Sequence, residues 1–170
     1  MNLKDSKLIA ADRIEVWQSL LSAEVLRQCV PGCQEMSGSP EVGFEATVVQ
    51  KVGPVKATFK GVVTLSDIVE GESLTLSGEG KGGAAGFAKG GAKVFLTDED
   101  GGTLLSYDVE AKVGGKLAQL GSRIIDGFAK KMADQFFEEF RNAVQGPSEE
   151  VEGSEDGEKK KGWLGRLVSN

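Results

Sequence analysis

The chain has 170 residues, of which 39% are hydrophobic, and this is enough for one ordinary core but not for two well-built domains. A formal net charge of −6, with no basic face interleaved with aromatic residues, argues against nucleic-acid binding. No run approaches the ~18 apolar residues of a spanning helix, and the N-terminus does not resemble a signal peptide. Cys29 and Cys33 are too few for a disulfide scaffold, so we expect a protein of the reducing cytoplasm.

The first third of the chain predicts one strand and two short helices. Residues 3–9 alternate weakly between apolar and polar, which indicates a strand that leads into a helix after Asp12. Ile14, Trp17, Leu20 and Leu21 then follow at helical spacing. A second helix over residues 23–28 should end at Val30-Pro31-Gly32, because proline and glycine cannot continue it.

From Phe44 onward the apolar period changes to two. Residues 44–52 and 55–65 alternate around a Gly53-Pro54 turn, which predicts a hairpin with one solvated face. Similar alternation around residues 74–76, 92–96 and 105–111 predicts further strands, separated by glycine-containing turns. We therefore expect a meander of about six strands after the short helices, or about seven strands in all.

A long helix is predicted over residues 117–144. Its apolar stripe consists of Leu120, Ile124, Ile125, Phe128, Met132, Phe136, Phe137, Phe140 and Val144. A stripe of this width must be buried against something large, and the concave side of the sheet is the available surface. The sequence therefore predicts an α+β domain over residues 1–145, in which a curved antiparallel sheet surrounds a long C-terminal helix.

Residues that could perform chemistry are few. Histidine is absent, which removes the commonest general base and the commonest metal ligand. Cys29 and Cys33 flank a turn and have no further ligand to complete a coordination sphere, so we expect a structural turn and no metal. The stretch 78–83 matches G-x-G-x-x-G, but a strand follows it rather than a helix, so we expect sheet curvature there and not phosphate binding.

An internal cavity is the more informative prediction. The period-two rule directs several glycines and alanines inward, and small inward residues on a curved sheet leave space. The space is suited to a hydrophobic ligand. The alternative is that Phe128, Met132 and Phe136 of the long helix fill it completely. The residues expected to face a ligand are Phe44, Phe59, Gly61, Val63, Leu76, Gly78, Gly90, Ala92, Val94, Leu105, Tyr107, Ile125, Phe128, Met132 and Phe136.

The C-terminal segment changes composition abruptly. Residues 146–158 are rich in Ser, Glu, Gly and Asp, which predicts a disordered acidic linker. Residues 159–170 reverse the charge and predict a basic amphipathic tail that contacts a membrane surface, or else a protein partner or only solvent. The residues expected to contact the membrane are Lys159, Lys160, Lys161, Trp163, Leu164, Arg166, Leu167 and Val168.

A series of short motifs resembles one known family over residues 1 to about 145. The motifs are Trp17, Leu20 and Leu26; Cys29-Val30-Pro31-Gly32-Cys33; Lys51-Val52-Gly53-Pro54-Val55 with Phe59 and Gly61; Gly102-Thr103-Leu104 with Tyr107; the run from Gly114 to Arg123; and Phe136-Phe137. Together they resemble the CoxG family of the carbon monoxide dehydrogenase system, a branch of the START-like (SRPBCC) helix-grip superfamily. The C-terminal tail lies outside the matched region.

The resemblance implies a non-catalytic accessory protein with no covalent cofactor. It implies partnership with carbon monoxide dehydrogenase or a related molybdenum hydroxylase, recruitment of that enzyme to the inner face of the cell membrane, and a bound apolar molecule such as an isoprenoid quinone or lipid. One alternative is a START-like enzyme that uses Tyr107, Asp108 or Glu110 as acid or base, although alternation directs Asp108 and Glu110 to solvent. The other alternative is a membrane-tethering scaffold without a ligand.

Overall fold

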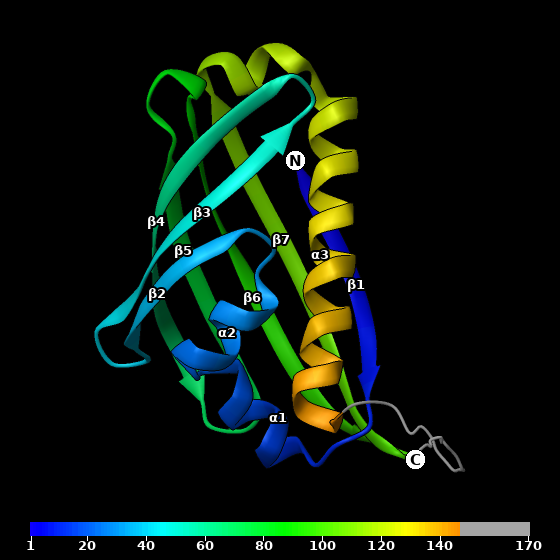
Figure 1. The fold of residues 1–170 in the computed structure, drawn as a ribbon. Helices are drawn as coiled ribbons and strands as arrows, with labels where there is room; N and C mark the ends of the chain where they lie inside the picture. The colour runs from blue at the N-terminus through cyan, green and yellow to red at the C-terminus, as the bar shows by residue number, and fades with distance from the viewer. Residues whose placement is uncertain (147–170) are drawn as a thin grey trace, which may run out of the picture. The chain divides into compact units, whose positions relative to one another are not determined.

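A seven-stranded antiparallel sheet dominates the computed structural model, which describes residues 1–146 (Figure 1). The strands are β1 (Asn2–Ile9), β2 (Cys33–Ser39), β3 (Gly43–Val52), β4 (Val55–Val69), β5 (Ser73–Lys81), β6 (Phe87–Glu99) and β7 (Gly102–Gly114). Their order in the sheet is β1-β7-β6-β5-β4-β3-β2, so the first strand pairs with the last. The predicted α+β class and the meander are confirmed.

The helices occupy the positions expected from the apolar spacing, with one correction. They are α1 (Arg13–Leu20), α2 (Ala23–Cys29) and α3 (Ser122–Gln145), with short 3-10 helices η1 (Gly83–Ala85) and η2 (Gly115–Leu120). The prediction that the long helix starts at residue 117 is wrong. Gly121 adopts φ +89°, a left-handed conformation that ends η2 and separates it from α3.

The connection from α2 to β2 is fixed by specific contacts. The Ser22 hydroxyl accepts a hydrogen bond from the Val25 amide and caps α2. After α2, Gly32 adopts φ +77° against the backbone of β3, where an added Cβ would lie 2.1 Å from the Val49 carbonyl oxygen. The Val49 amide donates to the Gly32 carbonyl, and the Gln50 side chain donates to the Pro31 carbonyl. The Val-Pro-Gly turn is therefore structural.

One part of the interior is filled with side chains. Val52, Leu117 and Ile125 form a buried cluster at the end of the sheet where β3 and β7 stop and α3 begins. Partly buried side chains pack around it, namely Met1, Val55, Phe59, Val113, Leu120 and Phe128. We call this cluster the packed end.

Residues Met1–Phe140 form one compact unit, and the last described residues carry the end of α3. The predicted linker, apart from Gly146, and the predicted membrane-contacting tail lie outside the described residues. None of the helices within residues 1–146 combines the length and the apolar character needed to cross a membrane.

Candidate ligand-binding cavity

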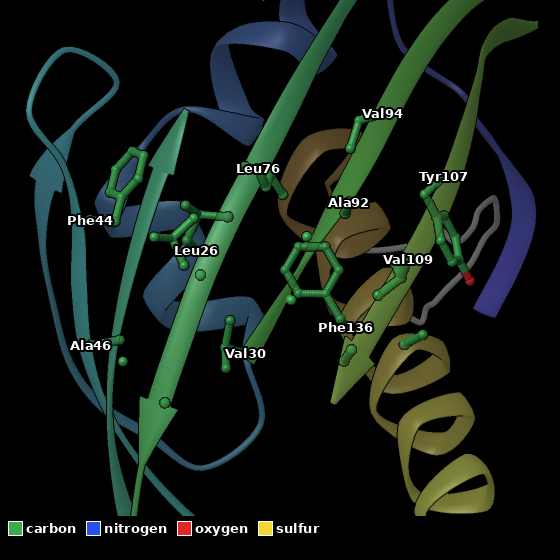
Figure 2. A pocket seen from close by; sticks show the side chains of 18 of the residues that line it. Leu26, Val30, Phe44, Ala46, Leu76, Ala92, Val94, Tyr107, Val109 and Phe136 are labelled. Carbon is green, nitrogen blue, oxygen red and sulfur yellow. The ribbon is translucent and has the colours of Figure 1, made fainter. Parts of the chain in front are cut away.

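Next to the packed end, the interior of the sheet is hollow. A cavity of about 590 Å³ lies between the inner face of the sheet and the helices α1, α2 and α3 (Figure 2). Pockets that bind drug-sized molecules typically measure roughly 300–1,000 Å³. The space is therefore large enough for a small organic ligand.

The hollow arises from the size of the inward-facing residues on the central strands. Ala46, Gly61, Gly80 and Ala88 lie directly opposite one another on β3, β4, β5 and β6, and all four line the cavity. A second row pairs Gly78 with Gly90. Small side chains at paired positions on four neighbouring strands leave a gap that no single large side chain from the sheet fills.

An aromatic group on α3 forms one wall of the cavity. Phe136 and Phe137 line it together with Ala133, one turn earlier on the helix. The Phe137 ring stacks on Tyr107 of β7 with 5.2 Å between the centroids, and Phe136 meets Phe137 edge to face at 4.9 Å. A further stacked contact joins Phe136 to Phe140 at 5.8 Å. These contacts hold Phe136 in the wall.

The opposite wall comes from a region that the sequence analysis did not assign to the site. The cavity is lined there by Leu20 of α1 and the following Leu21, by Leu26 of α2 and the following Val30, and by Met36 of β2. Leu26 and Val30 are four residues apart, so they lie on the same side of one helical turn and both approach the cavity in Figure 2. This four-residue spacing is the sequence feature from which the wall could have been predicted.

Most of the residues predicted to face a ligand line this cavity. They are Phe44, Gly61, Val63, Leu76, Gly78, Gly90, Ala92, Val94, Leu105, Tyr107 and Phe136. Phe59, Ile125 and Phe128 do not line it, because they belong to the packed end, and the half-buried Met132 does not line it either. Phe128 and Met132 thus leave the hollow unfilled. The part that each residue plays in ligand binding remains a prediction.

The cavity wall contains few polar groups. Tyr107 is 6% exposed, and burial, followed by the charges of Asp5 and Asp134, raises the pKa of its phenol, so it is neutral at physiological pH. Glu79, Lys89 and Glu110 border the cavity but are exposed. Asp108 is also exposed. The alternation prediction for Asp108 and Glu110 is confirmed, and neither is a buried acid or base.

An ion-pair group fixes α3 against the edge strand β1. The Lys7 ammonium lies 3.2 Å from Asp134 of α3 and 3.5 Å from Asp5, and Lys130 approaches the other Asp134 oxygen at 3.1 Å. The Lys130 hydrogen bond, followed by that of Lys7, lowers the pKa of Asp134. The ion pair connects the helix that carries the aromatic wall to β1, and the contact of Phe137 with Tyr107 connects it to β7 (Figure 1).

The two cysteines are inert in this setting. Cys29 is fully buried at the end of α2, and burial, with a smaller effect of Glu139, raises the pKa of its thiol to about 11. Burial also raises the pKa of Cys33, whose thiol donates to the Glu35 carbonyl at 3.2 Å. Nucleophilic thiols have lowered pKa values, so neither cysteine is of that kind. Within the described part of the chain no three His, Cys, Asp or Glu side chains gather as a metal site would require.

Comparison with known proteins gives a family and a fold. The CoxG family, which is described as a subunit of carbon monoxide dehydrogenase, matches residues 6–145. A conserved protein from Geobacillus kaustophilus is similar in structure, with a TM-score of 0.79, 28% identity, and coverage of 85% of this chain and 95% of that one. No curated protein matches the sequence.

Two more distant structures show the fold alone. A protein from Rhizobium leguminosarum has a TM-score of 0.67 at 14% identity, with 85% of this chain and 94% of that chain covered. A START superfamily protein from Mycobacterium smegmatis has a TM-score of 0.63 at 12% identity, with 85% and 97% covered. The fold is START-like.

Proposed function

The chain belongs to the CoxG family of carbon monoxide dehydrogenase subunits, and from this membership we propose that it is a non-catalytic accessory protein of carbon monoxide dehydrogenase or a related molybdenum hydroxylase. In this proposal it holds a hydrophobic ligand in its cavity and brings the enzyme to the cytoplasmic membrane. The ligand we propose is an isoprenoid quinone, which would link the enzyme to respiratory electron transport.

The observation that carries the ligand proposal is the cavity of about 590 Å³. Unfilled apolar volume costs stability, because the side chains around it lose dispersion contacts and leave apolar surface exposed to water. A bound apolar molecule restores those contacts, at roughly 25 cal/mol for each Å² of apolar surface removed from water. A protein that retains such a space gains stability when the space is occupied.

The chemistry of the walls supports a neutral molecule with a flat ring and an apolar tail. The rings of Tyr107, Phe136 and Phe137 offer faces and edges against which a planar ring packs. The paired glycines and alanines leave room for a branched hydrocarbon chain. The charged residues at the cavity are exposed, so an ionic ligand would find no buried counter-charge there.

The non-catalytic role is supported by the polar groups at the cavity. The sequence contains no histidine, and Asp108 and Glu110 are exposed to solvent. The phenol of Tyr107 has a raised pKa, so it does not act as a base near neutral pH. These features fit a carrier better than an acid–base enzyme.

Extraction of the protein tests the ligand proposal. We expect organic extracts of the gently purified full chain to contain an isoprenoid quinone by mass spectrometry. Ala92→Leu, which places a larger side chain in the cavity, should reduce the amount of bound quinone, whereas Lys93→Leu, at the next position on the outer face of β6, should leave it unchanged. An extract free of quinone and of any other apolar molecule would contradict the carrier role.

Vesicle binding tests membrane recruitment. The full chain should sediment with anionic vesicles, and Trp163→Ala/Leu167→Ala should reduce the bound fraction, because the change removes apolar side chains from the predicted tail. Equal sedimentation of both proteins would remove the tail from the proposal. Co-purification of the full chain with the dehydrogenase from native cells would identify the partner.

A further inference from the structure

One end of the folded unit is formed by three segments whose charged residues are all basic. The turn between β3 and β4, the loop between β5 and β6, and the segment from the end of β7 into α3 come together at this end (Figure 1). Residues 50–56, 80–88 and 112–124 contain no Asp or Glu. Their exposed basic residues are Lys51, Lys56, Lys81, Lys112, Lys116 and Arg123, which we call the basic end.

Close backbone contacts hold these segments against one another. Gly53, at the tip of the β3–β4 turn, lies against Leu120 and Ile124, each about 3.8 Å from the position of an added Cβ. Gly86 approaches the end of β7 so closely that an added Cβ would lie 2.0 Å from the Gly114 carbonyl oxygen. Leu120 also packs against the packed end, so that cluster supports the first contact from inside. The basic end is therefore one rigid surface.

Lysines at this end face other lysines across the ladder, so their charges repel. Lys51 lies directly opposite Lys56 in the ladder. Lys60 and Lys89, next to the basic end, lie opposite Lys81 and Lys112, although Lys89 also faces Glu79 of β5. Like charges at facing positions destabilise a sheet. None of the ion pairs found within residues 1–146 involves a member of the basic end. The facing lysines Lys51 and Lys56 thus have no acidic partner among these ion pairs, which is typical of a surface that meets an opposite charge elsewhere.

Large apolar side chains lie among the lysines. Phe87 is 41% exposed and packs over Gly114, and Ile124 is 44% exposed beside Arg123. Pro54 is exposed at the tip of the β3–β4 turn. Basic residues interspersed with exposed apolar ones are the composition that binds the interface of an anionic bilayer.

The opposite end of the unit has the opposite sign. The start of α1, the β4–β5 turn and the β6–β7 turn carry Asp12, Glu15, Asp67, Glu70, Glu72, Asp98, Glu99 and Asp100, all exposed. Arg13 is the single basic residue in those segments, and it is paired with Asp98 at 3.1 Å. An anionic surface would thus attract one end of the unit and repel the other.

We propose that the basic end lies against the surface of an anionic lipid bilayer, with Phe87 and Ile124 in the headgroup region. This inference rests on the membrane recruitment in the proposed function and assigns it an orientation: the acidic end faces away from the lipid. It also adds a contact surface to the folded unit that is separate from the predicted tail.

The composition favours lipid over an acidic protein partner. The positive charges come from several separate segments and cover the end without an alternating acid that would set a register with a protein surface. Mobile anionic headgroups need only charge density and shallow apolar insertion. The basic end provides both.

The test compares full-length variants on vesicles made of equal parts phosphatidylglycerol and phosphatidylcholine. Lys56→Glu/Lys112→Glu takes one lysine from each of two facing pairs, and we expect its partition coefficient to fall at least about 25-fold, since each positive charge contributes about fivefold. Arg27→Glu/Lys131→Glu makes the same change in net charge at exposed positions outside the basic end and should bind as the unaltered chain does. Thermal unfolding of each variant checks that it is folded.

The possible results separate this inference from the proposed function. If both variants bind like the unaltered chain, the basic end is not the lipid surface, while recruitment by the tail stands. If the unaltered chain fails to bind anionic vesicles, membrane recruitment and this inference are both overturned, while ligand extraction still tests the carrier role. If the basic-end variant loses the dehydrogenase but keeps the lipid, the surface belongs to an acidic protein and the inference is wrong.

Discussion

The packed end and the hollow region are built on the same sheet and the same helix, yet one is filled and the other is not. At the packed end the sheet contributes Val52, Val55 and Phe59, which meet Ile125 and Phe128 of α3. Further along the same strands Ala46 and Gly61 stand among the larger inward residues, and α3 presents Phe136 to a cavity instead. Side-chain size along each strand therefore decides where the sheet packs directly on the helix.

The packed end and the hollow region therefore have different roles, one in stability and the other in binding. The packed end gives the unit a core that needs no ligand, so the hollow region is free to remain open. Four experiments test this division.

The largest effect should come from paired truncations in the two regions. Leu117→Ala removes a 4% exposed side chain from the packed end and should lower the free energy of unfolding by roughly 2–5 kcal/mol. Leu76→Ala enlarges a cavity that already exists, so we expect a loss of about 1 kcal/mol in the ligand-free protein. Urea unfolding measures both. Equal losses would mean that the hollow is filled in solution.

The burial of Cys29 tests whether α2 stays closed over the hollow. A thiol whose folded pKa is raised stabilises the fold below its unfolded pKa, and that stability is lost as the pH rises through the folded value. For Cys29 the loss should fall between pH 9.0 and about 11 and amount to roughly 1–3 kcal/mol. The free energy of unfolding, measured as a function of pH, should show this alkaline loss of stability, and Cys29→Ala should abolish the loss. An unchanged alkaline profile in Cys29→Ala would indicate that water reaches the thiol.

A larger side chain in the hollow should weaken quinone binding and raise the free energy of unfolding. Ala92→Leu adds methyl and methylene groups to empty apolar space, so the ligand-free protein should gain roughly 1–2 kcal/mol. Added quinone should then raise the melting temperature less than it does in the unaltered chain. Lys93→Leu, on the outer face, should leave the quinone response unchanged. A loss of stability in Ala92→Leu would mean that the cavity walls cannot accommodate a larger side chain.

The smallest effect concerns the outer surface of the packed end. Lys56→Glu replaces a repulsive pair with Lys51 by an attractive one, and the protein should gain about 0.2–1 kcal/mol. The gain should shrink in high salt. Chemical unfolding at two salt concentrations measures it, with Thr58→Glu as a control on the same face of β4. A destabilised Lys56→Glu would show that the lysine pair is compensated in the fold.

Much of the fold could be predicted from the sequence because its signals are local. Alternation from Phe44 onward identified the strands, and the spacing of the phenylalanines identified the long helix. The start of that helix could not be predicted, because Leu117 and Leu120 continue the apolar pattern through η2 and only the left-handed Gly121 separates the two helices. Strand β2 was not placed individually, since Cys33–Ser39 has a weak apolar pattern.

The cavity could be predicted in part for a similar reason. Alternation determines which side of a strand faces inward, so Gly78 and Ala92 were assigned correctly to the interior side. Alternation does not determine how far a hollow extends along a strand, and Phe59 was therefore placed in the cavity although it lies in the packed end. The wall formed by Leu26 and Val30 depends on how α2 packs on the sheet, which is a long-range property.

The pairing of β1 with β7 affects how the protein folds during synthesis. Asn2 lies opposite Glu110 in the ladder, so the N-terminal strand has no partner until most of the chain has left the ribosome. At 5–20 residues per second this delay is on the order of ten seconds. Contacts between residues so distant in sequence also slow folding itself. Strand β1, which contacts α3, is therefore synthesised early but pairs with β7 only late.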